Sequence, residues 1–88
     1  MNILLEKWVS WQEYRESVYV FHEALKKVYI FSGSALDFWS AMLSCSDREE
    51  ITDQLCRKYG EEFRDAISAD LGMFLDELMN YGLIQEVR

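Results

Sequence analysis

The first third of the chain has the composition of β-strands. It is rich in Trp, Tyr, Val and Phe, residues that pack well on a pleated sheet. The segments 17–21 and 27–31 are the best strand candidates, and an earlier, less regular strand is expected near Trp8 to Tyr14. The segment between the strands 17–21 and 27–31, His22 to Lys26, is polar and predicts a turn. A helix over Glu23 to Lys27 is the alternative.

Ser32-Gly33 predicts a break in secondary structure, and a helix is predicted directly after it. Ser34, followed three residues later by Asp37, forms a near capping box, so Ser34 is the expected N-cap. The helix should continue to about Ser44, because apolar residues recur there at helical spacing. These residues are Ala35, Leu36, Phe38, Trp39, Met42 and Leu43.

The second helix is predicted to open at residues 46–49, where Ser-Asp-Arg-Glu reads as a capping box. Ile51, Leu55 and Tyr59 repeat every four residues and form its apolar stripe. Gly60 follows directly and is expected to end the helix in the left-handed conformation common at C-termini.

The third helix is predicted from about Glu62 to Tyr81. Acidic residues at its start suit the positive end of the helix dipole, and Gly82 stops it. Leu83 and Ile84 should then fold back onto the core. One side of this helix carries the apolar residues Ile67, Leu71, Phe74, Leu75 and Leu78.

Length and composition predict one cytoplasmic domain spanning residues 1–88. Half of the 88 residues are hydrophobic, which is enough for one core. No apolar run approaches the length of a membrane span, and the N-terminus carries no secretory pattern. Cys45 and Cys56 form no disulfide framework, which favours a reducing compartment.

The net negative charge is confined to the helical part of the chain. Residues 1–33 hold four basic and four acidic residues, so the net charge of −7 falls entirely on residues 34–88. Within the predicted third helix, residues 61–81, six acidic residues stand against Arg64 alone. This balance repels phosphate backbones and favours basic peptides or proteins as partners.

The sequence predicts no enzyme, no cofactor and no metal site. His22 is the single histidine, and no catalytic motif surrounds any Ser or Cys, so we interpret it as an ordinary surface or partly buried residue. Cys45 and Cys56 are too far apart for a zinc knuckle. Two pairs of carboxylates share a helix face, Glu49 with Asp53 and Glu61 with Asp65, and solvated helix surfaces explain both.

Two binding functions are compatible with a small sheet and three helices. A winged-helix DNA-binding regulator is one, but its recognition helix would place six carboxylates near phosphates. Peptide binding is the other, because Lys27 to Phe31 can form an exposed sheet edge to which an extended peptide adds. Tyr29 and Phe31 would then point to one face of the sheet, and Val28 and Ile30 to the other. A structural or dimerisation domain without a ligand is the third possibility.

Nearly the whole chain, roughly residues 17 to 85, resembles PqqD-like proteins, the RiPP recognition elements that accompany peptide-modifying enzymes. The most specific part is the ending Asp-Leu-x-x-Phe-Leu-x-x-Leu-x-x-x-Gly-Leu-Ile, residues 70–84. The matching residues are Tyr29, Phe31, Ala35, Trp39, Ile51, Leu55, Tyr59, Asp70, Leu71, Phe74, Leu75, Leu78, Gly82, Leu83 and Ile84. The sequence departs from the pattern at residues 23–26, where many relatives have a Gly-rich turn, and in its three tryptophans.

The resemblance implies an α+β fold of the winged helix-turn-helix type, with a three-stranded antiparallel sheet followed by three helices. It also implies binding of the leader segment of a ribosomally made precursor peptide, as a strand in the cleft between the third strand and the third helix. By position, the peptide-binding residues would be Val28, Tyr29, Ile30 and Phe31 from the strand, and Ala66, Asp70, Met73, Phe74 and Glu77 from the helix. Phe74 would form the floor of this groove.

The resemblance further implies a partner enzyme that modifies the bound precursor peptide. This enzyme would be a radical SAM enzyme or a leader peptidase and cyclase pair. A pathway of quinone-cofactor biosynthesis, lasso-peptide biosynthesis or radical peptide modification would fit a chain of this kind. Neither nucleic acid nor membrane is expected among the partners.

Overall fold

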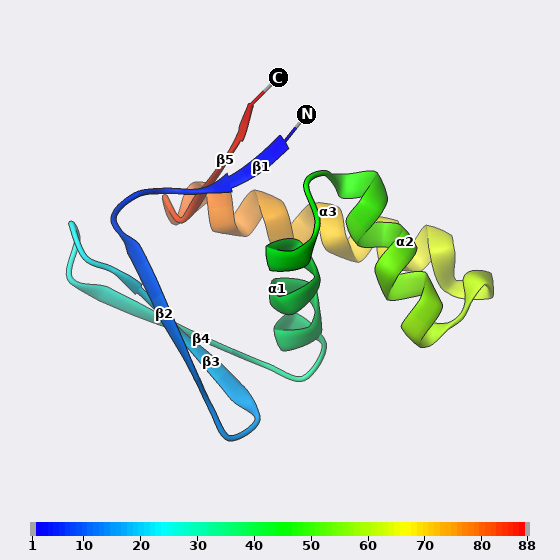
Figure 1. Cartoon of the computed structure of the whole chain (residues 1–88), viewed down its shortest axis with the longest axis horizontal. Coiled ribbons are helices and arrows are strands. Elements are labelled where there is room, and N and C mark those ends of the chain that lie inside the picture. Colours follow the sequence, from blue (N-terminus) through cyan, green and yellow to red (C-terminus); the bar gives the residue numbers. More distant parts are fainter. Residues whose placement is uncertain (1, 88) are drawn as a thin grey trace.

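The computed structural model describes residues 2–87, which form two sheets and three α-helices (Figure 1). The expected three-stranded antiparallel sheet followed by three helices is confirmed, and a second, two-stranded sheet accompanies it. In chain order the elements are β1 (Asn2–Leu5), β2 (Val9–Tyr14), β3 (Ser17–His22), β4 (Lys27–Ser32), α1 (Ser34–Ser44), α2 (Arg48–Tyr59), the short 3-10 helix η1 (Glu61–Phe63), α3 (Arg64–Asn80) and β5 (Ile84–Val87). None of the helices over residues 2–87 has the length and apolar character needed to cross a bilayer.

The three-stranded sheet has the order β2-β3-β4 and buries one face against the helices. Val20 in the central strand is fully buried and lies opposite Tyr29 of β4. Because side chains alternate across a strand, Tyr29 and Phe31 share the inner face with Val20. Val28 and Ile30 lie on the outer face, where 50% and 57% of their surfaces are exposed.

The turn between β3 and β4 forms without a glycine. The backbone N–H of Leu25 donates to Nδ1 of His22 at 3.1 Å, so the imidazole replaces a backbone acceptor in the turn. Lys26 takes the left-handed conformation, with φ of 57°. The alternative of a helix over Glu23 to Lys27 is therefore wrong, because the pairing of His22 with Lys27 closes a hairpin there.

The two-stranded sheet was not predicted from the sequence. It pairs β1 with β5 in antiparallel register, so Leu5 lies opposite Ile84 and the two ends of the described chain run side by side (Figure 1). Ile3 of β1 and Ile84 of β5 are buried and belong to the hydrophobic core. The indole N–H of Trp8 donates to the carbonyl of Gly82 at 2.8 Å and fixes the chain that leads from β1 to β2.

The predicted capping of α1 by Ser34 is wrong. Gly33 occupies the N-cap position, with φ of 62°, and Ser34 is already the first helical residue. The carbonyl of Gly33 accepts from the backbone N–H groups of Leu36 and Asp37. Glycine reaches a positive φ without steric cost, which lets the chain turn from the sheet into the helix within one residue.

The capping box of α2 is displaced by one residue from its predicted position. Asp47 is the N-cap, and its carboxylate accepts from the backbone N–H of Glu50 at 2.9 Å. The carboxylate of Glu50 in turn accepts from the backbone N–H of Ser46 at 3.3 Å. Gly60 ends the helix as predicted, but it does so as the C-cap with φ of 120° and ψ of 140°, outside the left-handed helical conformation that was expected.

The core lies where the sheet and the three helices meet. All five apolar residues predicted on the third helix are buried, and Leu83 and Ile84 fold back onto the core as expected. The helix itself starts later than predicted, because residues 61–63 form the 3-10 turn η1 before α3 begins at Arg64. Tyr59 departs from its predicted core role, with 40% of its surface exposed.

Candidate peptide-binding site

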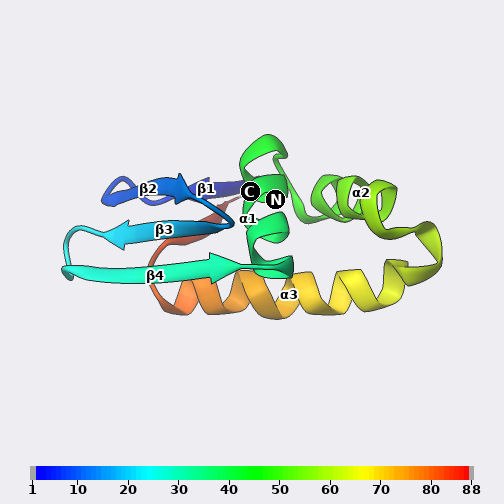
Figure 2. The same cartoon turned by 90° about the horizontal axis from the view of Figure 1, so that it is seen from below.

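Strand β4 is an open edge beside a long helix. Within residues 2–87 it pairs with β3 alone, so alternate residues on its other side have free backbone N–H and C=O groups. In Figure 2 α3 lies beyond this edge, on the side away from β3, and Figure 1 shows the helix set back from the sheet, with Tyr29 and Phe31 reaching it through their rings. An extended chain that adds to β4 would therefore lie next to α3.

Aromatic contacts join the edge strand to the helices. The rings of Tyr29 and Tyr81 stack with centroids 4.4 Å apart. Phe31 meets Phe74 of α3 edge-to-face at 5.4 Å and stacks near Trp39 of α1 at 6.1 Å. These contacts hold β4 at a set distance from α3 before any ligand binds, which lowers the cost of ordering the site.

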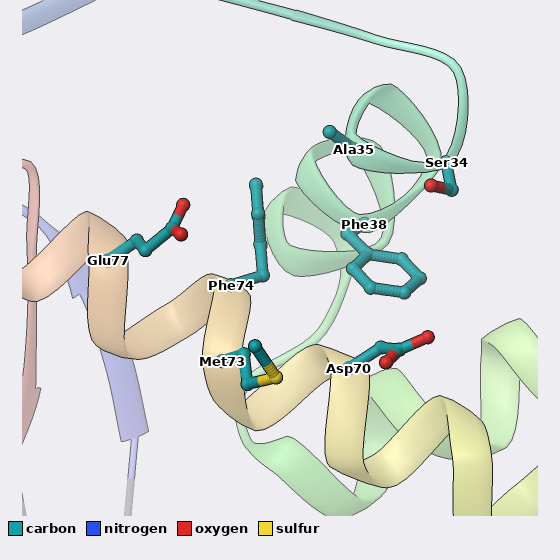
Figure 3. Close-up of a pocket in the computed structure, with 7 residues that line it drawn as sticks. All are labelled: Ser34, Ala35, Phe38, Asp70, Met73, Phe74 and Glu77. Carbon is teal, nitrogen blue, oxygen red and sulfur yellow. The ribbon is translucent and has the colours of Figure 1, made fainter.

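A pocket of about 240 Å³ lies between the start of α1 and the middle of α3 (Figure 3). We call it the α1–α3 pocket. The ring of Phe74, which is 8% exposed, meets the ring of Phe38 edge-to-face at 5.7 Å inside it. Its lining consists of Ser34, Ala35, Phe38, Asp70, Met73, Phe74 and Glu77.

The α3 side of this pocket is acidic at both ends and apolar between them. In Figure 3 the carboxylates of Asp70 and Glu77 lie on either side of Met73, which is 68% exposed. Neither carboxylate forms an ion pair or a side-chain hydrogen bond with another residue of the described range 2–87. Such a surface suits a ligand that carries basic groups around an apolar side chain.

A second pocket, of about 320 Å³, continues from the first toward the start of α3. We call it the Phe63 pocket. It shares Ser34, Phe38 and Asp70 with the α1–α3 pocket. Its remaining lining residues are Tyr59, Phe63, Ala66 and Ile67. Aromatic and aliphatic groups therefore dominate its wall, and Asp70 stands where the two pockets meet.

One wall of the Phe63 pocket is fixed by a polar contact between α1 and α2. The hydroxyl of Tyr59 donates to the carboxylate of Asp37, and the Lys58 ammonium donates to the other oxygen at 2.8 Å. The hydrogen bonds from Lys58 and Tyr59 lower the pKa of Asp37, and the hydrogen bond to Asp37 raises the pKa of Tyr59. Asp37 thus stays ionised and holds the tyrosine ring against the pocket.

The predicted site residues fall into three groups in the structure. Asp70, Met73, Phe74 and Glu77 come together in the α1–α3 pocket, while Ala66 lies in the Phe63 pocket. Tyr29 and Phe31 point inward to the aromatic contacts. Val28 and Ile30 lie on the outer face, so any role of theirs in strand addition would run through the backbone.

The contribution of α1 to the site was missed by the sequence reasoning. Ser34, Ala35 and Phe38 line the α1–α3 pocket, although they were assigned only to a helix cap and an apolar stripe. A signal for them was present in the sequence. A single glycine separates β4 from α1, so the first turn of that helix has to lie at the end of the edge strand.

The histidine and the two cysteines lie outside both pockets. His22 is buried, stacks on Trp8 at 5.6 Å and accepts a backbone hydrogen bond. Cys45 and Cys56 are free thiols, and Cys45 donates to the side-chain oxygen of Gln54 at 3.2 Å. Among residues 2–87, His, Cys, Asp and Glu side chains form no group of three that could hold a metal ion.

Comparison with solved structures relates this fold to a known complex. The chain is similar to the structure titled "TbiB1 in Complex with the TbiA(beta) Leader Peptide", with a TM-score of 0.84, 23% sequence identity and coverage of 96% of both chains. At this identity the likeness establishes the fold. A search of curated proteins found no match. The profile of the family described as "Coenzyme PQQ synthesis protein D (PqqD)" matches residues 17–84, most of the sequence. The chain therefore belongs to the PqqD family.

Proposed function

We propose that this chain binds the leader segment of a ribosomally synthesised precursor peptide and presents it to a modifying enzyme. The leader adds as a strand to β4, in the groove between that strand and α3. The chain itself acts without catalysis. Its peptide-binding residues are those predicted from the sequence: Val28, Tyr29, Ile30, Phe31, Ala66, Asp70, Met73, Phe74 and Glu77.

The observation that carries this proposal is the open edge of β4, which lies near the α1–α3 pocket. Edge strands expose a row of backbone groups, and an added peptide satisfies them while pockets select its side chains. The leader peptide in the TbiB1 structure supports the ligand class, since that protein has the same fold. Membership of the PqqD family supports it independently of that structure.

The charge of the site supports a leader with basic residues. Asp70 and Glu77 line the α1–α3 pocket and are both exposed, so this part of α3 attracts cations. The modifying enzyme is a radical SAM enzyme or a leader peptidase and cyclase pair. A cytoplasmic location fits this role and the two free thiols.

Duplex DNA as the ligand has no observation in its favour. A winged-helix reader would insert α3, whose exposed carboxylates would then face the phosphates. The same residues are favourable for a basic peptide. Peptide binding is therefore the function that the geometry and the charge support together.

The test is an NMR titration of the full chain with the leader segment of the precursor peptide encoded beside its gene. We expect binding at micromolar strength or better. The amide signals of residues 27–31 and 66–77 should shift, because these segments border the proposed groove. Signals of β1 should move less, because that strand pairs with β5 and lines neither pocket.

A scrambled peptide of the same composition serves as the control, because it keeps the charge and loses the order of side chains. If both peptides bound with equal strength, charge attraction alone would explain the binding, and the groove would show no selectivity for the order of side chains. Unchanged spectra at high peptide concentration would contradict the proposed function. Salt-dependent binding to duplex DNA in place of the peptide would support the regulator instead.

A further inference from the structure

We infer that the Phe63 pocket holds one bulky apolar side chain of the precursor peptide, from the residues just beyond the segment that pairs with β4. This inference rests on the proposed function and adds a specificity-determining subsite to it. The subsite lies past the end of the edge strand, where the peptide no longer makes strand hydrogen bonds.

The two pockets are continuous with each other. Ser34, Phe38 and Asp70 line both, so no wall separates the α1–α3 pocket from the Phe63 pocket. Strand β4 ends at Ser32 and the chain reaches Ser34 two residues later. A peptide that follows β4 to its end therefore arrives at the junction of the pockets.

The lining of the Phe63 pocket leaves aromatic surface exposed. Phe63 is 51% exposed and Tyr59 is 40% exposed, although both are large aromatic side chains beside the buried Ile67. A cavity of about 320 Å³ exceeds the volume of any single side chain, so even the largest apolar side chain can enter it. Burial of that side chain would remove apolar surface from water on both partners.

Polar contacts hold the wall of the Phe63 pocket in place without a ligand. Asp37 holds the hydroxyl of Tyr59, and Arg64 forms ion pairs with Glu61 and with Asp53 of α2. These contacts tie η1 and the start of α3 to α2, on either side of Phe63. A ligand group entering the pocket meets a wall that is already ordered, which favours binding.

The charge at the pocket entrance selects the occupant. Asp70 stands at the junction without an ion-pair partner among the described residues, so it favours a peptide with a basic residue next to the apolar one. A second copy of this chain fits poorly, because its helical part carries the whole net charge of −7. The occupant is thus an apolar residue flanked by a basic residue in the precursor peptide.

The experiment fills the pocket and measures peptide affinity. Ala66→Leu places a larger side chain in the Phe63 pocket, and Ala69→Leu is the matched control on an exposed position of α3 outside both pockets. The probe is the leader segment of the precursor peptide encoded beside the gene, measured by calorimetry. We expect Ala66→Leu to weaken binding about 10-fold or more, while Ala69→Leu binds like the wild-type chain.

A peptide scan identifies the occupant. Each bulky apolar residue of the leader is replaced by Ala in turn, and each peptide is measured against the wild-type chain and against Ala66→Leu. One replacement outside the strand-forming segment should weaken binding to the wild-type chain about 10-fold and weaken binding to Ala66→Leu no further. Intermolecular NOEs from that residue to the ring of Phe63 test the same contact in the unmutated chain.

The outcomes separate this inference from the proposed function. Equal affinity of the wild-type chain, Ala66→Leu and Ala69→Leu would overturn the inference and leave leader binding standing. Equal weakening by both substitutions, or absence of NOEs to Phe63 in the wild-type complex, would also overturn it. Failure of the wild-type chain to bind the leader would remove the proposed function itself.

Discussion

Tyr29 in the edge strand stacks on Tyr81 at the C-terminal end of α3, with ring centroids 4.4 Å apart and 19° between the ring planes. The contact spans about fifty residues of sequence and joins the two elements that border the proposed groove. It lies at one end of that groove, and the pair of Phe31 and Phe74 lies further along. Strand and helix are thus held apart by aromatic rings, which leaves the free edge of β4 accessible.

Removal of this stack should destabilise the fold and loosen the groove. Tyr29→Ala and Tyr81→Ala should each lower the free energy of unfolding, and their double mutant should show a coupling of about 0.5–1.5 kcal/mol. Urea denaturation measures all four corners of the cycle. Ile30→Ala is the control, because Ile30 is 57% exposed on the outer face of the same strand. Additive effects of the two tyrosine substitutions would contradict a direct contact.

Two glycines of the C-terminal half should respond to alanine in opposite directions. At Gly82, φ is 76° and an added Cβ would lie 3.1 Å from Nε2 of His22, so Gly82→Ala should cost about 1–2 kcal/mol or more. At Gly72, within α3, the nearest atom would be Nη1 of Arg48 at 3.6 Å, an ordinary contact. Gly72→Ala should therefore stabilise the chain by about 0.5–1 kcal/mol. Thermal melts of both variants measure the signs, and destabilisation of similar size by both would contradict this account.

Charge reversal on the α3 side of the groove should weaken the binding of a basic leader peptide. Asp70→Lys and Glu77→Lys each replace attraction with repulsion, so we expect affinity to fall about 3- to 30-fold at low salt. The loss should shrink as salt is raised, because exposed charges are screened. Asp65→Lys makes the same charge change on α3 outside both pockets and is the control. Equal weakening by all three variants would point to net charge instead of the groove.

The ion pair between Arg48 and Glu86 should make the stability of the fold depend on pH. Arg48 donates from two nitrogens to the two oxygens of Glu86 at 2.7 Å each, and these hydrogen bonds hold the pKa of Glu86 below its ordinary value of 4.5. A carboxylate with a lowered pKa in the folded state stabilises the fold above its unfolded pKa. That contribution is lost as the pH falls through the folded pKa.

Glu86→Gln should therefore be less stable than the wild-type chain at neutral pH, by about 1 kcal/mol for a partly exposed pair. The difference should narrow as the pH is lowered below about 4.5, since the wild-type carboxyl then becomes protonated as well. Denaturation of both proteins across this pH range measures it. A difference that stays constant from neutral to acidic pH would show that the pair contributes nothing through ionisation.

The sequence by itself determined the elements whose signals are local. The strands over 17–21 and 27–31 and the apolar side of the third helix follow from periodicity, because each buries one face against the same core. Glycines at 33, 60 and 82 marked element boundaries for the same local reason. The acidic side of α3 was also readable, since charge does not depend on the fold.

Tertiary structure alone decided which distant residues meet. Pairing of β1 with β5 joins four-residue strands about eighty residues apart, and such short segments carry too little pattern to predict. The α1–α3 pocket brings Phe38 beside Asp70, and the Phe63 pocket brings Tyr59 beside Ala66, through helix packing that no spacing in the sequence encodes. The strand and the helix of the site were predicted from the sequence. The position of α1 against both was decided by packing, because helix contacts depend on the whole core.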